Sequence, residues 1–410
     1  MSAPKTGARR QRPARPQQPE PARPASEQPA PVLSGPGCAA GAAQQVVGHA
    51  VTATCWLDAD GGQNNPASVS FSGRRADITG RPRRGDRFEK VETVGPLVPG
   101  SGPVSVTAKV SDITAGEWIV WARSASGTGH NRQAGTLPGP PAAGRLGLQR
   151  FLWPKGNPVT AGNTGTRVTT RAGGFATGPG LVPASWVPLV ALGVAVALAV
   201  QAVLAGREHL STGAALGISL AASVAGAAGA RAWFVALNRG KVQGIPTQGL
   251  CIQGFIGATA VVLTGGLALA GLPIGTFLDA TTPGLFFGMA IGRQGCFLHG
   301  CCVGRPTASR WGIWASDGRI GARRVPTQQL ESLACLVIGL AALLLVLQSR
   351  RPAAGTVFIG AVAAYAVCRQ LLFPYRAEPR RSSLGRVASM ITAGLVLVAD
   401  VIVAILVMLG

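Results

Sequence analysis

The chain has 410 residues, and its 38 Lys and Arg outnumber its 16 Asp and Glu to give a formal net charge of +22. In a soluble protein this balance would suggest nucleic-acid binding, but the sequence carries no nucleic-acid reader motif, so we expect no nucleic acid among its partners. Its second half consists of long apolar runs, and basic residues beside such runs report membrane topology and contact with anionic lipid headgroups.

Residues 1–37 form a predicted basic tail. They are rich in Pro and Arg and contain almost nothing to bury, so we expect disorder and, at most, a weak attraction to anionic lipid. No apolar segment interrupts residues 1–33, and no secretory signal peptide is therefore expected there.

Residues 38–135 are predicted to form a small all-β domain of the sandwich type. Segments that alternate, or that carry β-branched and aromatic side chains, are separated by turn clusters. The predicted strands are 46–57, 67–71, 104–110 and 117–124. Residues 136–183 contain repeated Gly, Pro, Thr and Asn, and this composition predicts a linker.

Residues 184–410 are predicted to form an all-α, polytopic membrane helix bundle with about seven transmembrane helices. The apolar segments run at 184–205, 213–237, 250–272, 277–291, 328–347, 355–373 and 387–409. Most of them approach the roughly 20 residues that cross ~30 Å of hydrocarbon. The fourth segment is short, which suggests a tilted or partly re-entrant helix. Small residues crowd the second segment and indicate close packing between helices.

A glycine-rich stretch at 292–307 follows the fourth apolar segment. It includes Gly292, Arg293, Gly295 and Gly304. An arginine at membrane depth costs roughly 2.5–3.5 kcal/mol on insertion, so Arg293 is expected to face the bundle interior and to serve a function. The glycines suggest irregular backbone, which membranes tolerate only where it is buried or lines a cavity.

Further arginines begin or end other apolar segments. Arg231 ends the second, Arg369 ends the sixth with Arg376 shortly after it, and the run 324–331 opens the fifth. Three or four guanidinium groups with the carboxylate of Glu331 would line a polar cavity that suits a phosphate-bearing lipid, because Arg binds phosphate bidentately. The alternative is that these arginines extend to the headgroups and pair locally, which this reasoning favours for Arg376, Arg380 and Arg381.

The order of these motifs resembles the prolipoprotein diacylglyceryl transferase family over about residues 187–410. The Gly-Arg-x-Gly-x-Phe stretch that starts at Gly292 resembles the signature loop of that family. The other matching motifs are Asp279 with Pro283, Gly229-Ala230-Arg231, Arg324-x-Pro326-x-Gln328-x-x-Glu331, and Arg369 with Arg376. The resemblance does not extend to the β domain or the tail.

The resemblance implies a multi-pass transferase of a bacterial-type cytoplasmic membrane. Its partners would be membrane lipid, phosphatidylglycerol as the diacylglyceryl donor and preprolipoproteins as acceptors, with glycerol 1-phosphate leaving. The lipobox cysteine thiol would receive the group. Arg293 and Arg369 would hold the lipid phosphate and stabilise charge on the departing group. The implied substrate-binding residues are Arg231, Gly292, Gly295, Gly304, Gln328, Glu331 and Arg376.

The chain departs from the family at its acid–base positions. Ile252 stands where the family usually has a histidine, and Phe373 stands where it has a glutamate. The family's asparagine and glutamate in the signature loop are Cys296 and Cys301 here. A relative that binds lipid or a partner without catalysis is therefore the alternative. His299, in the same loop, is the candidate replacement for the lost catalytic base.

The signature stretch also carries soft metal ligands. Cys296, His299, Cys301 and Cys302 lie within seven residues, and zinc or copper binds such side chains. Adjacent cysteines rarely both ligate one tetrahedral ion, the usual Cys-x-x-Cys spacing is absent, and small buried thiols commonly pack beside glycines. We therefore expect no metal and no cofactor, with metal or thiol-redox chemistry as a lesser alternative.

Two arguments disagree about membrane topology. The region before the first apolar segment and the second, fourth and sixth loops carry most of the Lys and Arg, so the positive-inside rule places the N-terminus in the cytoplasm. The family resemblance places the N-terminus and the signature loop outside, where preprolipoproteins arrive. We favour the outside for the signature loop, and the side and role of the β domain and the oligomeric state stay open.

Overall fold

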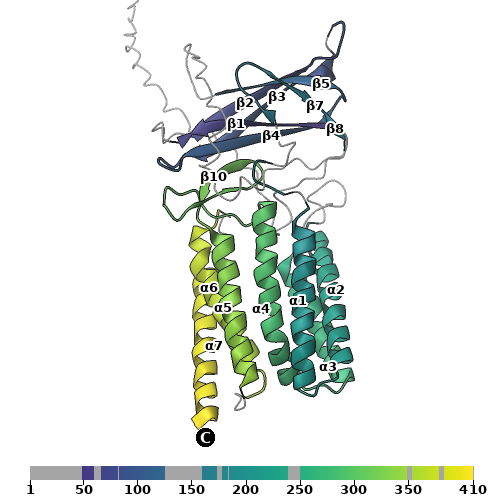
Figure 1. Cartoon of the computed structure of the whole chain (residues 1–410), viewed down its shortest axis with the longest axis vertical. Helices are drawn as coiled ribbons and strands as arrows, with labels where there is room; N and C mark the ends of the chain where they lie inside the picture. The colour runs from purple at the N-terminus through teal and green to yellow at the C-terminus, as the bar shows by residue number, and fades with distance from the viewer. Residues whose placement is uncertain are drawn as a thin grey trace, which may run out of the picture. The chain divides into compact units, whose positions relative to one another are not determined.

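The computed structural model describes residues 49–59, 66–81, 83–124, 159–172, 178–182, 184–238, 250–348, 353–377 and 383–409. The predicted tail 1–37 lies outside these residues. Within them, two β sheets precede seven long apolar helices (Figure 1). The predicted fold class is confirmed for this part of the chain.

The β domain consists of two sheets that share one hydrophobic core. Its long strands are β1 (His49–Asp58), β2 (Pro66–Arg75), β3 (Arg87–Pro96), β4 (Pro103–Ile113) and β5 (Glu117–Ser124). In one sheet β1 pairs with β4, and in the other β2 lies between β3 and β5, all antiparallel. Cys55, Phe71 and Trp118 come from three of these strands, are fully buried and belong to the shared core. Burial alternates along β5, as its sequence pattern predicts. β1 and β4 are buried on both faces over much of their length, and β3 lies outside the predicted strands.

Three short strands extend the two sheets. They are β6 (Val159–Thr160), β7 (Thr166–Thr169) and β8 (Arg171–Ala172). β6 and β8 pair with β1, and β7 pairs with β5. Residues 159–172 belong to the range predicted as linker. Their Gly and Asn content indicates loops, and only pairing with strands far away in the sequence makes these segments extended.

Seven helices follow that are long and apolar enough to cross a membrane. They are α1 (Trp186–Arg207), α2 (Thr212–Leu237), α3 (Ile252–Leu269), α4 (Ile274–His299), α5 (Thr327–Leu347), α6 (Thr356–Leu372) and α7 (Ser383–Leu409). Each coincides with one predicted apolar segment. Large apolar side chains such as Leu269 and Val203 are exposed on their surfaces, as expected where lipid covers a protein.

The prediction that the fourth apolar segment is short, with irregular backbone at its glycines, is wrong. α4 continues as regular helix through residues 292–295 and ends at His299, where Gly300 adopts a left-handed conformation with φ of 80°. Gly295 serves packing: a Cβ atom there would lie 3.3 Å from Cβ of Leu189 on α1. Contact with α1 supports the helix where the glycines by themselves weaken it.

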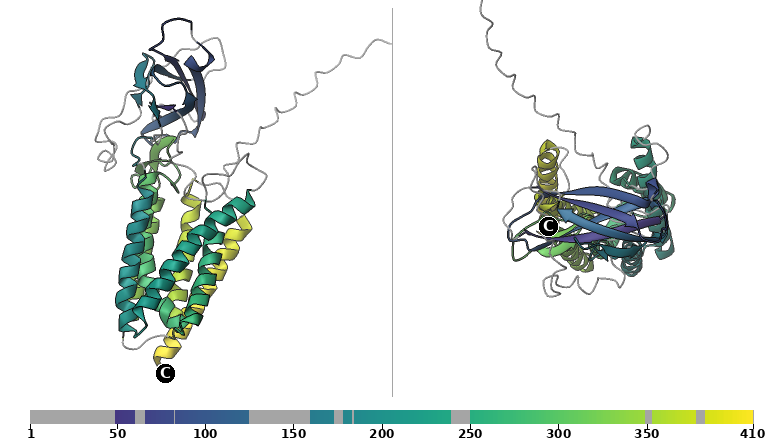
Figure 2. Two further views of the ribbon diagram at one scale, coloured as in Figure 1. Left: turned by 90° about the vertical axis from the view of Figure 1, so that its right-hand side faces the viewer. Right: turned by 90° about the horizontal axis from the view of Figure 1, so that it is seen from above.

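Close helix pairs form where glycines face each other. α1 lies beside α4 in the views of Figures 1 and 2, and α2 is in extensive contact with α3. A Cβ atom at Gly193 of α1 would lie 2.6 Å from the carbonyl oxygen of Gly288 in α4. One at Gly229 of α2 would lie 2.6 Å from that of Gly254 in α3. Small residues thus allow the close approach that membrane helices need to associate.

A β hairpin between α4 and α5 joins the first sheet. Its strands are β9 (Ile313–Ser316) and β10 (Ile320–Arg324). Gly321 of β10 lies opposite Ser105 of β4, so the sheet continues from the β domain into the connection between two membrane helices (Figure 1). The apolar-span prediction leaves this segment as a basic loop. Asp317-Gly318 between two apolar stretches is nevertheless a typical hairpin signal.

Side chains reinforce this junction. Trp314 of β9 packs against Trp56 of β1 with ring centroids 6.0 Å apart. Its Nε1 donates a hydrogen bond to the carbonyl oxygen of Pro103 at 3.3 Å. Arg319, in the hairpin turn, forms an ion pair with Glu92 of β3 at 2.7 Å. The β domain and the connection between α4 and α5 therefore lie on the same side of the membrane, as the even number of helices between them requires.

We expect replacement of Trp314 by alanine to loosen this junction. The side chain is 6% exposed, and loss of a buried Trp side chain typically costs about 3 kcal/mol or more. Amide hydrogen exchange at Thr107 of β4 should accelerate, because its N–H donates to the carbonyl oxygen of Arg319 in the hairpin and would lose that partner if β10 were no longer held against β4. The matched control is Trp311→Ala, since Trp311 lies in the same connection but is 74% exposed. Equal exchange rates in both variants would contradict the prediction.

Candidate functional site

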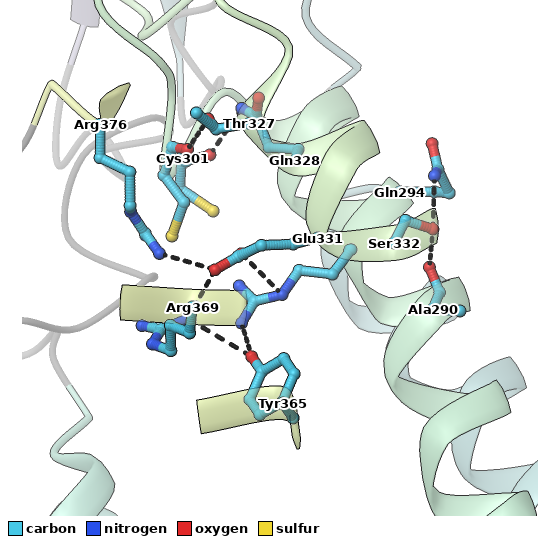
Figure 3. Close-up of polar contacts among 12 residues, drawn as sticks. Ala290, Gln294, Cys301, Thr327, Gln328, Glu331, Ser332, Tyr365, Arg369 and Arg376 are labelled. Carbon is cyan, nitrogen blue, oxygen red and sulfur yellow. Dashed lines mark hydrogen bonds and ion pairs between the residues drawn. The ribbon is translucent and has the colours of Figure 1, made fainter. Parts of the chain in front are cut away.

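Glu331, in the second turn of α5, is surrounded by three arginines (Figure 3). Its Oε2 lies 3.1 Å from Nε of Arg293. Its Oε1 lies 2.9 Å from Nη1 of Arg369 and 3.1 Å from Nη1 of Arg376. The structure thus brings together four of the predicted site residues, which we call the Arg–Glu cluster.

The ends of three helices place these side chains. Arg293 lies near the end of α4, and Arg369 lies in the last turn of α6. Arg376 follows a 3-10 turn, Phe373–Tyr375, that extends α6. Helices α4 and α6 end on the side of the membrane where α5 begins, so their terminal side chains meet the first turns of α5.

Tyr365 on α6 is a further member that the sequence prediction missed. Its hydroxyl accepts a hydrogen bond from Nη2 of Arg293 at 2.8 Å and lies 3.4 Å from Nη1 of Arg369 (Figure 3). Its ring packs edge-on against Phe286 of α4. Tyr365 precedes Arg369 by four residues, a spacing that places two side chains on one helix face and that signals this neighbour in the sequence.

The Arg–Glu cluster carries more positive charge than its carboxylate balances. Among the described residues, the ion pairs of the cluster join three guanidinium cations to one carboxylate, which is a formal excess of two positive charges in this part of the chain. The side chains of Glu331 and Arg376 are 3% and 2% exposed, whereas that of Arg369 is 36% exposed. Uncompensated charge between apolar helices is costly, so the cluster favours a bound anion, with Arg369 as its accessible member.

Two other predicted binding residues lie next to the cluster. Gln328, one turn before Glu331 on α5, donates a hydrogen bond from Nε2 to the carbonyl oxygen of Cys301 at 3.0 Å. Gly304 pairs with Arg376 in an isolated β bridge. Both contacts hold the backbone that follows α4 against the start of α5 and the end of α6.

The remaining predicted binding residues have different surroundings. Gly295 is buried against α1, and a Cβ atom at Gly292 would meet nothing within 4 Å. Arg231 is half-buried near the end of α2, and it is not among the described residues that form ion pairs with Glu331. The roles of these three residues in substrate binding stay predictions.

His299 is the last residue of α4 and lies six positions after Arg293. At about 100° per residue, the two side chains point about 120° apart around the helix. Its Nδ1 is buried, and among the described residues it has no hydrogen-bond partner. The structure therefore offers a histidine with an unsatisfied ring nitrogen at the end of the helix that carries Arg293, and its role as a base stays a prediction.

The interpretation that Arg376 extends to the lipid headgroups is wrong. Its side chain is almost fully buried and paired with Glu331, because the 3-10 turn after α6 directs the chain back over the cluster. Arg324 was grouped with the phosphate-binding arginines, but its Nη2 pairs with Asp317 at 3.0 Å and its Nη1 donates to the carbonyl oxygen of Gly304. Arg324 therefore fixes the hairpin to the backbone that follows α4.

Comparison with known proteins agrees with this architecture. The family profile described as prolipoprotein diacylglyceryl transferase matches residues 184–409, which contain all seven helices and the Arg–Glu cluster. Phosphatidylglycerol–prolipoprotein diacylglyceryl transferases from several bacteria are similar to part of the chain. That of Dehalococcoides mccartyi is 33% identical over 143 residues, which cover 34% of this chain and 54% of that protein.

Two further relatives give the same picture. The enzyme of Streptomyces avermitilis is 33% identical over 142 residues, which cover 33% of this chain and 41% of that protein. The enzyme of Finegoldia magna is 28% identical over 216 residues, which cover 51% of this chain and 85% of that protein. The alignment spans about half the length of the Dehalococcoides and Streptomyces proteins. Since the family profile matches more than half of the chain, the chain belongs to the prolipoprotein diacylglyceryl transferase family.

Proposed function

We propose that the chain transfers a diacylglyceryl group from phosphatidylglycerol to the thiol of a lipobox cysteine in a prolipoprotein. Membership of the family supports this reaction, and the relatives named above carry it in their descriptions. The observation that carries the proposal is the excess positive charge of the Arg–Glu cluster between apolar helices. A phospholipid in the bilayer can supply the phosphate anion that balances the positive charge of the Arg–Glu cluster.

The arginines have hydrogen-bond donors to offer to this phosphate. A guanidinium group carries five N–H donors, and Glu331 and Tyr365 accept only part of those of Arg293 and Arg369. Glu331 and Tyr365 hold both guanidinium groups in place before the lipid arrives. Such preorganisation increases the stabilisation of charge that develops in the transition state.

The reaction is a displacement at a glycerol carbon. The acceptor sulfur forms a bond to the carbon that carries the phosphate oxygen, and that carbon–oxygen bond breaks with its electron pair passing to the oxygen. Glycerol 1-phosphate leaves, and the thiol proton passes to a base. Arg293 and Arg369 stabilise the negative charge on the leaving phosphate. A thiol with an ordinary pKa near 8.5 needs that base, because the thiolate is the nucleophile.

The test is transfer by the purified full-length chain in detergent or in vesicles. With phosphatidylglycerol and a lipobox peptide, we expect a peptide whose mass increases by one diacylglyceryl group. A peptide with Ser in place of the lipobox Cys should gain nothing, since a hydroxyl is a weak nucleophile at neutral pH. Absence of product with the Cys peptide, from a chain that is folded and monodisperse, would refute the proposed reaction.

A second candidate function is lipid or partner binding without transfer. The observation that favours it is Ile252, which is the first residue of α3, is 56% exposed and stands where the family usually has a histidine. Phosphatidylglycerol retained by the purified chain, together with no peptide product, would support this alternative.

Substitution of His299 tests whether this residue replaces the catalytic base that the chain lacks at the family's usual position. We expect His299→Gln to lower the transfer rate by about 10²-fold, because general base catalysis typically contributes at least that factor. The acidic limb of the pH–rate profile should also disappear, since the titrating group is gone. A His299→Gln variant that keeps both the rate and the acidic limb would show that another group accepts the thiol proton.

A further inference from the structure

Three thiols converge at the end of α4. Cys296 lies in the last turn of the helix, and Cys301 and Cys302 follow Gly300. Their Sγ atoms all lie within 4.8 Å of one another, and the three residues are 4%, 6% and 7% exposed. We call these residues the thiol cluster.

The backbone that builds the thiol cluster is tightly held. The N–H groups of Gly300 and Cys301 both donate to the carbonyl oxygen of Cys296 at 3.0 Å, which reverses the chain at the end of the helix. From the start of α5, Gln328 donates to the carbonyl oxygen of Cys301, and Thr327 Oγ1 donates to that of Cys302 at 3.3 Å. Two helices therefore fix the positions of the three thiols.

Cys302 adopts a conformation that its residue type rarely takes. Its φ is 57°, in the left-handed region, which costs a residue with a Cβ atom about 1 kcal/mol or more. Strain of this kind persists where the surrounding structure enforces it, and it concentrates at functional sites. Here it accompanies the placement of Cys302 Sγ near the other two sulfurs.

The spacing of the sulfur atoms suits a soft metal ion. A tetrahedral ion with metal–sulfur bonds of about 2.3 Å places its sulfur ligands about 3.8 Å apart, so a small contraction of the cluster is enough. Structural zinc sites are closed by four protein ligands, whereas three sulfur ligands converge among the described residues. Thiolates select Cu(I) as well as zinc, and Cu(I) therefore fits this set better.

The neighbouring charge favours a thiolate site. Three thiolates with one Cu(I) ion carry a formal charge of −2, which equals in size the positive excess of the Arg–Glu cluster. Figure 3 shows the Cys301 side chain turned towards Glu331 and Arg376. Nearby guanidinium groups stabilise thiolates against reprotonation. A loaded site would thus balance the Arg–Glu cluster when no lipid phosphate is bound.

From the convergence of the sulfurs, the fixed backbone and the adjacent positive charge, we infer that Cys296, Cys301 and Cys302 form a binding site for a soft metal ion, Cu(I). Binding replaces three thiol protons with one ion, and the protons pass to solvent without any change of oxidation state. The sequence argues against a metal because adjacent cysteines rarely both ligate one tetrahedral ion and no Cys-x-x-Cys pair is present. In the structure, Cys296 from the helix supplies a third sulfur, and all three sulfurs lie within 4.8 Å of one another.

The experiment is an anaerobic titration of the reduced full-length chain in detergent with Cu(I) buffered by a chromophoric chelator. We expect uptake of about one ion per chain, with Cys301→Ser weakening the affinity by about 10²-fold or more, since even changes to groups beyond the ligands cost 10–100-fold. Cys368→Ser is the matched control, because Cys368 on α6 lies outside the thiol cluster, and it should bind like the wild type.

Two further measurements keep the inference open to refutation. If Cys301→Ser fails to fold, Cys296→Ser tests the same site from the helix, and circular dichroism identifies the folded variant. A parallel titration with Zn²⁺ tests the choice of ion. Cu(I) uptake that is unchanged when all three cysteines are replaced, or uptake of Zn²⁺ in place of Cu(I), would overturn the inference. Metal uptake does not depend on transfer, so its failure would leave the proposed reaction untouched.

Discussion

Replacement of Arg293 by alanine is expected to reduce diacylglyceryl transfer by about 10³-fold or more. Loss of one preorganised donor to a developing negative charge commonly costs about 10²–10³-fold. Arg293 is also a partner of Glu331 and Tyr365, so its removal disturbs the positions of both. The measurement is the initial rate of lipobox-peptide modification with phosphatidylglycerol as donor.

Two variants make this result specific. Arg293→Lys keeps the charge but loses the planar fork, and we expect it to recover only a small part of the rate, because Lys binds phosphate as a point charge. Arg207→Ala is the matched control, since Arg207 is exposed at the end of α1, on the opposite side of the bundle from the cluster. Undiminished transfer in Arg293→Ala would refute the assignment of the site.

Replacement of Glu331 by alanine is expected to destabilise the chain more than any other single change considered. The carboxylate is 3% exposed and pairs with three arginines, and removal of one partner from a buried ion pair typically costs about 3–5 kcal/mol. We expect the upper end of this range, because three guanidinium groups lose their shared anion at once. The melting temperature of the purified chain should fall by roughly 10 °C.

Because Glu331 is shared by three arginines, we expect the stability losses caused by substitutions within the Arg–Glu cluster to be non-additive. In the double variant Glu331→Ala with Arg376→Ala, the loss of stability should be smaller than the sum of the two single losses, since one buried cation is removed together with its anion. The control is Glu117→Ala, which breaks an exposed pair with Arg167 at 3.7 Å. That change should cost about 0–1 kcal/mol. Additive losses at Glu331 and Arg376 would mean that the cluster does not act as a unit.

The β domain lies on the side of the membrane from which the proposed acceptor would reach the Arg–Glu cluster. The junction between β4 and β10 places this domain on the side of the membrane where α4 and α6 end and where the Arg–Glu cluster lies. Under the proposed function, that side is the one from which prolipoproteins approach. A chain loosened at the junction by Trp314→Ala therefore tests whether the β domain contributes to acceptor binding. An increased KM for the peptide with an unchanged maximal rate is the expected result.

Local sequence patterns determined the architecture of this protein in outline. Apolar runs of about 20 residues locate the seven helices, because the thickness of hydrocarbon fixes their length. β-branched and aromatic residues between turn clusters locate four of the five long strands of the sandwich, and β3 is the one that they miss. An arginine at membrane depth is so costly that its presence marks the site, which is why Arg293 and Arg369 could be identified before their contacts were visible.

Only the tertiary structure decided which of these residues meet. Arg376 is buried by a turn after α6, Tyr365 joins the cluster across helices, and three thiols converge around the end of α4. The hairpin after α4 is extended because β4, which lies far earlier in the chain, supplies its ladder partners. Periodicity reports only which face of one element is apolar. Contacts between elements depend on where helices end and how closely glycines let them approach, and the packing of the whole bundle sets both.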